Sequence, residues 1–239
     1  MRGEEPPRWG DASLSKFIEN AIQNSFATFS NLRPQCVLLP EIDKVFRSVQ
    51  ENLNHTKEWF PAIFLLRAHS AYLGGARLSL SGQVPEAYMV LRGCLENSLY
   101  GLYLSHSPAS QETWLRRHDD EKSKKQVRNE FAISSLMRFL ESLDPKSGKV
   151  VSSLYELTID FGAHPNERAL TSTLQQSETQ DSIRFDLIYL TGNTPLLHMC
   201  LKNTAQIGIS SLDVFRNVFR ERFDLLGVTA KLDGLRKGL

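Results

Sequence analysis

The stretch "GQVPEAYMVLRGCLENSLYGLYL", residues 82–104, decides the fold of this chain of 239 residues. Gly82 is suited to ending one helix, and Pro85 is suited to the first turn of the next. Almost every later position is apolar, so we expect this helix to be buried on most of its sides. Residues 57–81 have the same apolar character. Residues 57–104 therefore predict an antiparallel helical hairpin at the centre of a bundle.

Two adjacent glycines, Gly74 and Gly75, lie inside the first arm of that hairpin. A glycine in a helix interior costs about 1 kcal/mol relative to alanine. Such a cost is offset where another backbone approaches closely, because glycine has no Cβ to obstruct it. The pair therefore predicts tight packing against a neighbouring helix.

The N-terminal part of the chain predicts two further helices. Apolar residues recur at helical spacing over residues 13–29, and they form a stripe of Ile18, Ile22, Phe26 and Phe29. Pro34 and Pro40 bracket a connector. Residues 41–53 then predict the second helix.

The C-terminal half mixes helical and strand periodicity. Within the predicted helices of residues 119–162, residues 119–144 are charged first and amphipathic later, and residues 147–161 predict another helix that ends at Gly162. The alternation in "SIRFDLIYL" is typical of a strand, and "ALTSTL" is its expected partner, so residues 169–190 predict a small β-hairpin. Thr194 followed by Pro195 starts a long helix over residues 194–226.

The ends of the chain lack these patterns. Residues 1–12 predict a disordered leader, and residues 227–239 predict a flexible tail. No Pro/Gly/Ser-rich linker divides residues 13–226, so we expect one domain there. The fold class is mainly α, a multi-helix bundle with a small β-hairpin insertion near residues 169–190.

The composition narrows the classes of function. Hydrophobic residues make up 41% of the chain, and 28 basic residues nearly balance 27 acidic ones, so no overall basic field indicates a nucleic-acid partner. Three widely spaced cysteines fit neither a disulfide framework nor a CxxC metal site. The polar N-terminus and the absence of a long apolar run predict a cytoplasmic protein without a membrane segment.

One helix of the hairpin carries charge where apolar residues are expected. Arg92 and Glu96 are four residues apart in the middle of the buried helix. Buried charge is unfavourable unless it is paired, so the sequence predicts either a structural ion pair or a polar functional pocket. Expected partners on other helices are Arg67, His69, Arg77, Glu156 and Asp160.

The second polar motif is "DFGAHPNER", residues 160–168. His164 follows a predicted helix end, where the helix dipole favours its protonated form, and Pro165 restricts its backbone. A histidine in this position is either a general acid or base, or an exposed loop residue. Sequence alone leaves both interpretations open.

Together these two motifs resemble a widespread group of uncharacterised bacterial all-helical proteins that is similar to the HEPN superfamily. The resemblance is carried by "EAYMVLRGCLENSLYGLYL" and by "FGAHPNE", and it covers roughly residues 57–170. It implies Arg92, Glu96 and His164 as the polar signature. Asn166, together with Arg77 and Asp160, is expected to support them.

Members of the HEPN superfamily are helical bundles that commonly dimerise, and many are metal-independent ribonucleases in toxin–antitoxin or phage-defence systems. Their signature is an arginine and a histidine on the same helix with four to six residues between them, and no histidine of this chain has an arginine five to seven positions before it. Ribonuclease activity would instead require Arg92 and His164 to converge from different helices. In such a site His164 would be the general base for a ribose 2′-OH, and Arg92 would stabilise the phosphorane.

Two functions therefore remain open. One is an RNA-binding or metal-independent ribonuclease-like protein of the stress or phage-defence type, with Arg92, Glu96 and His164 as its site. The other is a non-catalytic interaction module or homodimeric scaffold in which the arginine–glutamate pair is structural. Motifs for metal hydrolysis, nucleotide binding and serine hydrolysis are absent, so no metal or small-molecule cofactor is expected. The expected partners are a second copy of the chain and either RNA or another protein.

Overall fold

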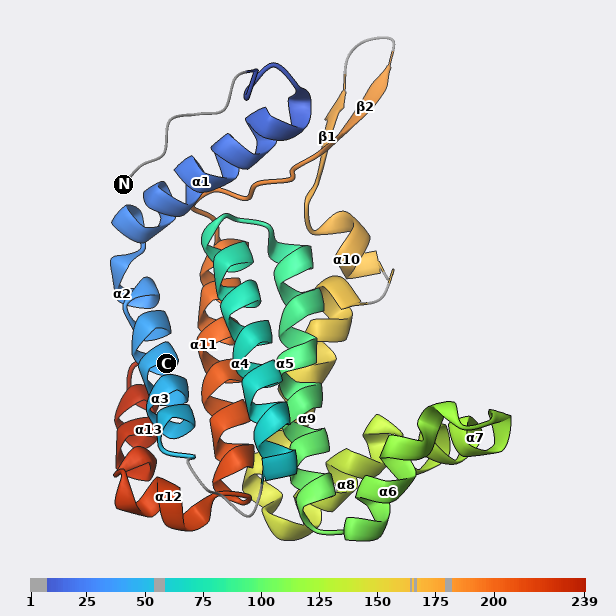
Figure 1. Ribbon diagram of the computed structural model, residues 1–239. Helices are drawn as coiled ribbons and strands as arrows, with labels where there is room; N and C mark the ends of the chain where they lie inside the picture. The colour runs from blue at the N-terminus through green and yellow to red at the C-terminus, as the bar shows by residue number, and fades with distance from the viewer. Residues whose placement is uncertain (1–7, 54–58, 164, 166, 179–181) are drawn as a thin grey trace.

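A computed structural model of the chain describes residues 8–53, 59–163, 165, 167–178 and 182–239. It is a mainly α multi-helix bundle with a small β-hairpin, as the sequence predicts (Figure 1). At its centre, α4 (Trp59–Leu80) and α5 (Val84–Ser105) form the predicted antiparallel hairpin. The long helix α11 (Pro195–Arg216) packs behind them. None of the described helices has the length and apolar content needed to cross a membrane.

The paired glycines do allow the close approach that the sequence predicts. A Cβ added at Gly75 would lie 2.5 Å from Leu91 on α5, and one added at Gly74 would lie 3.2 Å from Val90. The helices can therefore approach at this point only because Gly75 has no side chain. Leu91 is fully buried as a result.

The first helix, α1 (Ser13–Asn31), forms as predicted, but the face that it buries is not the predicted one. Its buried side chains are Ser15, Ala21 and Thr28, whereas Ile22, Phe26 and Phe29 of the predicted core stripe are 43–56% exposed. The orientation is fixed by Asn24, whose Nδ2 donates to the carbonyls of Ser81 and Thr191. These hydrogen bonds hold α1 across the end of the bundle (Figure 1).

The expected connector between Pro34 and Pro40 is helical instead. A short α2 (Arg33–Cys36) leads into α3 (Leu38–Glu51), which begins before the predicted residue 41. Both prolines lie in a first helical turn, where a backbone N–H is not needed. The loss of that N–H therefore does not interrupt these helices.

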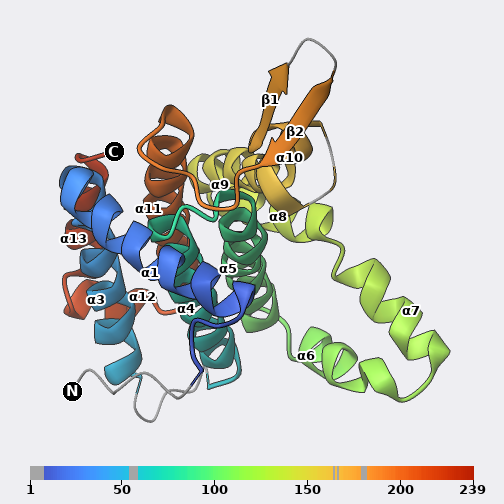
Figure 2. The same ribbon diagram turned by 90° about the horizontal axis from the view of Figure 1, so that it is seen from above.

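The predicted helices of residues 119–162 are present, but the region is divided more finely than predicted. Its parts are α7 (Glu121–Glu130), α8 (Ile133–Leu143), α9 (Pro145–Thr158) and a π-helix, η2 (Ile159–Ala163). Ahead of α7 lie two helices that the sequence does not predict, α6 (Pro108–Leu115) and the 3-10 helix η1 (Arg116–His118). Together α6, η1 and α7 project from the bundle as an arm (Figure 2).

The β-hairpin is shifted relative to the prediction. Its strands are β1 (Leu174–Glu178) and β2 (Ile183–Leu187), antiparallel with Leu174 opposite Leu187. The segment "ALTSTL" was expected to be a strand, but most of it belongs to helix α10 (Glu167–Thr171) or the turn after it. The polar residues 175–178, which lie between the two predicted strands, make up most of β1 instead. They can do so because the hairpin projects from the bundle and need not bury both of its faces (Figure 1).

The C-terminal prediction was also wrong in two places. The helix from residue 194 ends at Arg216, and a turn separates it from α12 (Arg220–Leu225). This turn lets Phe219 and Phe223 both reach the core. The expected flexible tail contains α13 (Val228–Arg236), which is held in place by burial of its apolar residues Val228 and Leu232.

A buried histidine joins α3 to α4. His69 is 6% exposed and stacks on Phe46, with 4.9 Å between the ring centroids. Its Nε2 donates to Asp43 Oδ1 at 2.6 Å, and its Nδ1 lies 2.9 Å from Gln50 Nε2. Burial would raise the pKa of Asp43, but hydrogen bonds from Arg47 and His69 outweigh it and lower the pKa below its usual range.

We predict that Asp43→Asn lowers the free energy of unfolding by about 1–2 kcal/mol at pH 7. The folded-state pKa of Asp43 is depressed, so its contribution is fully present above the unfolded pKa of about 4 and is lost as the pH falls through the folded value. Urea unfolding of both proteins between pH 7 and pH 3 measures this difference. Asp224→Asn, at an exposed position, is the control. A difference between wild type and Asp43→Asn that does not shrink at low pH would contradict the assignment.

Candidate functional site

The arginine and glutamate singled out in the sequence do form a pair. Arg92 Nε donates to Glu96 Oε1 at 2.8 Å along α5. The same carboxylate oxygen accepts a hydrogen bond from Tyr155 Oη of α9 at 2.9 Å. The guanidinium of Arg92 lies 5.0 Å from the centroid of the Tyr155 ring, within the range of a cation–π contact. Three side chains from two helices therefore form one connected cluster.

The cluster is less buried than the sequence predicts. The side chains of Arg92 and Glu96 are 24% and 31% exposed, whereas Tyr155 is 6% exposed as a residue. Burial opposes the charge on Arg92, but the hydrogen bond to Glu96 outweighs it and raises the pKa of the guanidinium. Burial, followed by the nearby Glu96 carboxylate, raises the pKa of Tyr155 well above its usual value. Tyr155 therefore remains a hydrogen-bond donor, and Arg92 remains a fixed cation at a partly open position.

Tyr155 is the member of this cluster that sequence reasoning missed. It lies on the buried face of α9 with Val151, Leu154 and Thr158. A buried tyrosine usually finds a partner for its hydroxyl group. That rule predicts a polar partner for Tyr155 but does not say which helix supplies it.

One turn before Arg92 on α5 lies Tyr88, which is fully buried and accepts a hydrogen bond from Asn203 Nδ2 at 2.7 Å. Phe161 of η2 packs on Tyr88, with 5.5 Å between the ring centroids. The next residue, Gly162, approaches the α5 backbone so closely that an added Cβ would lie 2.1 Å from the carbonyl oxygen of Pro85. The segment that leads to the His-Pro motif therefore packs along α5.

The other predicted site residues are distributed as follows. Asp160 lies in η2 and pairs with Arg168, with 2.9 Å between Oδ2 and Nη1. Arg77 is exposed in the last turn of α4. His164 and Asn166 lie outside the described residues. Among the predicted site residues that the structure describes, Arg92 and Glu96 are hydrogen-bonded to each other.

Thiol chemistry is disfavoured by burial. Cys36, Cys94 and Cys200 are all free and buried. Burial raises the pKa of each thiol, to about 11 for Cys36 and Cys200 and to about 12 for Cys94. A thiol is nucleophilic as its thiolate, so all three are expected to be unreactive. In the part of the chain that the structure describes, no three His, Cys, Asp or Glu side chains are arranged to hold a metal ion.

Comparison of the chain with protein-family models, with curated proteins and with solved structures found no match.

We predict that Tyr155→Phe lowers the free energy of unfolding by about 0.5–1.5 kcal/mol, because it removes the hydrogen bond to Glu96 and keeps the ring beneath Arg92. We expect Arg92→Ala to cost about 1–2 kcal/mol, less than the loss of one partner from a fully buried ion pair. Chemical denaturation of each variant and of the double variant measures the coupling between the two side chains. Strict additivity of the two losses would show that the cluster does not act as a unit.

Proposed function

We propose that this protein binds RNA through Arg92 and cleaves it without a metal ion, with Glu96 orienting the arginine and His164 acting as the general base. The observation that carries this proposal is that Arg92 is fixed by Glu96 and Tyr155 and is still a quarter exposed. A guanidinium that is already oriented loses little freedom when it binds a phosphate. Arginine is also suited to the planar, paired hydrogen bonds that phosphate oxygens accept.

The proposed reaction is an internal transesterification. His164 would take the proton of a ribose 2′-OH, whose oxygen attacks the adjacent phosphorus as the bond to the 5′-oxygen breaks. The departing 5′-oxygen takes a proton from water. Arg92 would stabilise the charge on the phosphorane, and the products would be a 2′,3′-cyclic phosphate and a 5′-hydroxyl end.

Support for a joint role of Arg92 and the His-Pro motif comes from the residues that precede His164 in the chain. Phe161 and Gly162 pack on Tyr88 and Pro85 of α5. One helical turn separates Tyr88 from Arg92, and about two turns, roughly 10 Å along the axis, separate Pro85 from Arg92. The chain thus approaches the arginine-bearing helix just before the histidine.

A homodimeric scaffold is the second candidate, and the β-hairpin favours it. Leu174, Ile183, Phe185 and Leu187 share one face of the hairpin with Gln176 and Glu178, because cross-strand partners lie on the same side of a sheet. All four apolar residues are 41–59% exposed. An isolated two-stranded hairpin is marginally stable in water, so an uncovered apolar face of this kind favours a second copy of the chain as its cover.

We predict that the wild-type protein cleaves end-labelled single-stranded RNA or a tRNA pool in EDTA. His164→Ala should lower the rate at least about a hundredfold, as expected for loss of a general base, and Arg92→Ala should lower it by a similar factor. His118→Ala, at an exposed position in η1, is the control and should retain full activity. Variants are compared after their melting temperatures have been matched. If the wild-type protein neither cleaves nor binds RNA, the ribonuclease proposal is wrong.

For the scaffold we predict a dimer in size-exclusion chromatography with light scattering. Phe185→Ser should weaken the dimer at least about tenfold, because it removes a large apolar side chain from the covered face. Gln175→Ser changes the opposite, polar face and should leave the dimer intact. A wild-type protein that is monomeric at high concentration excludes this arrangement.

A further inference from the structure

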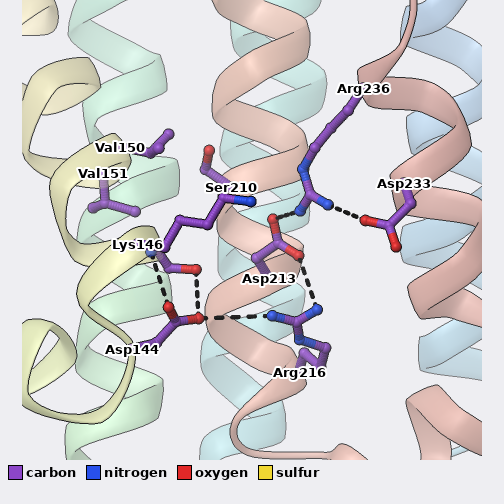
Figure 3. Close-up of a pocket in the computed structure, with 10 residues that line it drawn as sticks. Asp144, Lys146, Val150, Val151, Ser210, Asp213, Arg216, Asp233 and Arg236 are labelled. Atoms are coloured by element: carbon purple, nitrogen blue, oxygen red, sulfur yellow. Dashed lines mark hydrogen bonds and ion pairs between the residues drawn. The ribbon is translucent and has the colours of Figure 1, made fainter.

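A cavity of about 220 Å³ lies between α9, α11 and α13, and its lining includes no member of the Arg92 cluster (Figure 3). Its lining includes three carboxylates, Asp144, Asp213 and Asp233, and three cations, Lys146, Arg216 and Arg236. The formal charges of these six side chains cancel. Ligands with one net charge therefore gain no overall attraction here, whereas a ligand that carries both charges finds a partner for each.

Helical spacing places these residues together. Ser210, Asp213 and Arg216 recur every three residues along one side of α11, and Lys146 and Val150 are one turn apart on α9. The third wall is α13, which contributes Asp233 and Arg236. Because α13 was expected to be a flexible tail, the sequence alone did not reveal this cavity.

Asp213 is the unusual member of the lining. It is 5% exposed, and its Oδ2 accepts a hydrogen bond from Arg236. Its Oδ1 accepts no hydrogen bond from any residue that the structure describes. Arg216 Nη1 lies 3.9 Å from Oδ1, which is beyond hydrogen-bonding distance. Burial raises the pKa of Asp213 despite the hydrogen bond from Arg236. A buried carboxylate oxygen without a donor is unfavourable, so this atom would be stabilised by a donor from a ligand.

Arg216 is held loosely beside it. Its Nη2 lies 3.7 Å from Asp144 Oδ2, and its side chain is 30% exposed. Asp144 is already satisfied by the backbone N–H and the hydroxyl of Ser147, at 3.0 Å and 2.7 Å. Arg216 can therefore turn toward an incoming anion at little cost.

An apolar groove of about 530 Å³ adjoins the cavity and shares Lys146, Val150, Ser210 and Arg236 with it. Leu154, Leu157 and Ile209 extend the groove along α9 and α11. Val150, at the boundary between the two spaces, is 46% exposed. A ligand with its charges in the cavity would therefore have an apolar surface beside it.

We propose that this site binds a free α-amino acid with an apolar side chain. The ammonium group donates to Asp213 Oδ1, and the carboxylate accepts from Arg216 and Lys146. The side chain covers Val150 and Leu154. A simple carboxylic acid would leave Asp213 Oδ1 without a donor, and a simple amine would leave Arg216 and Lys146 unused. This inference is independent of the function proposed for Arg92.

The test is isothermal titration of the full chain with L-leucine and with two analogues, 4-methylpentanoate, which lacks the ammonium group, and isopentylamine, which lacks the carboxylate. We expect leucine to bind at a single site and each analogue to bind at least about tenfold more weakly, the loss expected for one charge-assisted hydrogen bond. Absence of binding by leucine at millimolar concentration overturns the proposal. Equal binding of either analogue also overturns it, because the site would then recognise one charge only.

Two variants locate the binding site. Asp213→Asn should weaken leucine binding by about ten- to a hundredfold. Val150→Glu places a carboxylate at the exposed boundary of the groove and should abolish binding without lowering the melting temperature. Val150→Glu therefore gives a readout even if Asp213→Asn does not fold. Lys125→Gln on α7 is the control and should bind leucine as the wild type does. Unchanged binding by Val150→Glu would show that leucine binds elsewhere.

Discussion

The close approach of α4 and α5 is the constraint on which the rest of the structure depends. At Gly75 the space between the two helices admits a hydrogen atom but no Cβ. At Gly101 of α5, the ring of Phe215 on α11 leaves almost as little space for a Cβ. Another side of α5 faces α9. Arg92 and Glu96 lie there, and Tyr155 completes their hydrogen bonding. The packing that buries the apolar residues thus also determines where the polar cluster lies.

The two polar clusters of the bundle differ in a way that bears on function. In the Arg92 cluster, Glu96 Oε1 accepts two hydrogen bonds, so the arginine is fixed before any ligand arrives. In the cavity beside α11, one oxygen of the buried Asp213 has no donor among the described residues. The first arrangement suits a rigid contact to a phosphate. The second leaves a buried oxygen that a donor from a ligand would satisfy, as the proposed binding site requires.

The apolar surface of this chain is unevenly distributed. Most of it is buried between α4, α5 and α11, but the exposed face of α1 and one face of the β-hairpin carry large apolar side chains. Phe17 of α1 contacts Tyr189 beside the hairpin, so these two surfaces adjoin (Figure 1). Adjoining apolar surfaces of this kind are more typical of an interface than of a surface that is always solvated.

By itself, the sequence determined the fold class, the central hairpin, the tight packing at the glycines and the start of α11 at Thr194. These features depend on local periodicity, capping and the absence of a side chain, all of which can be read from neighbouring residues. It also placed Arg92 and Glu96 one turn apart. Only the tertiary structure decided which side of α1 is buried, because Asn24 bonds to segments distant in the sequence. The same holds for the partner of Glu96 and for the cavity around Asp213. Each depends on contacts between residues far apart in the chain, and helical periodicity carries no information about which helices meet.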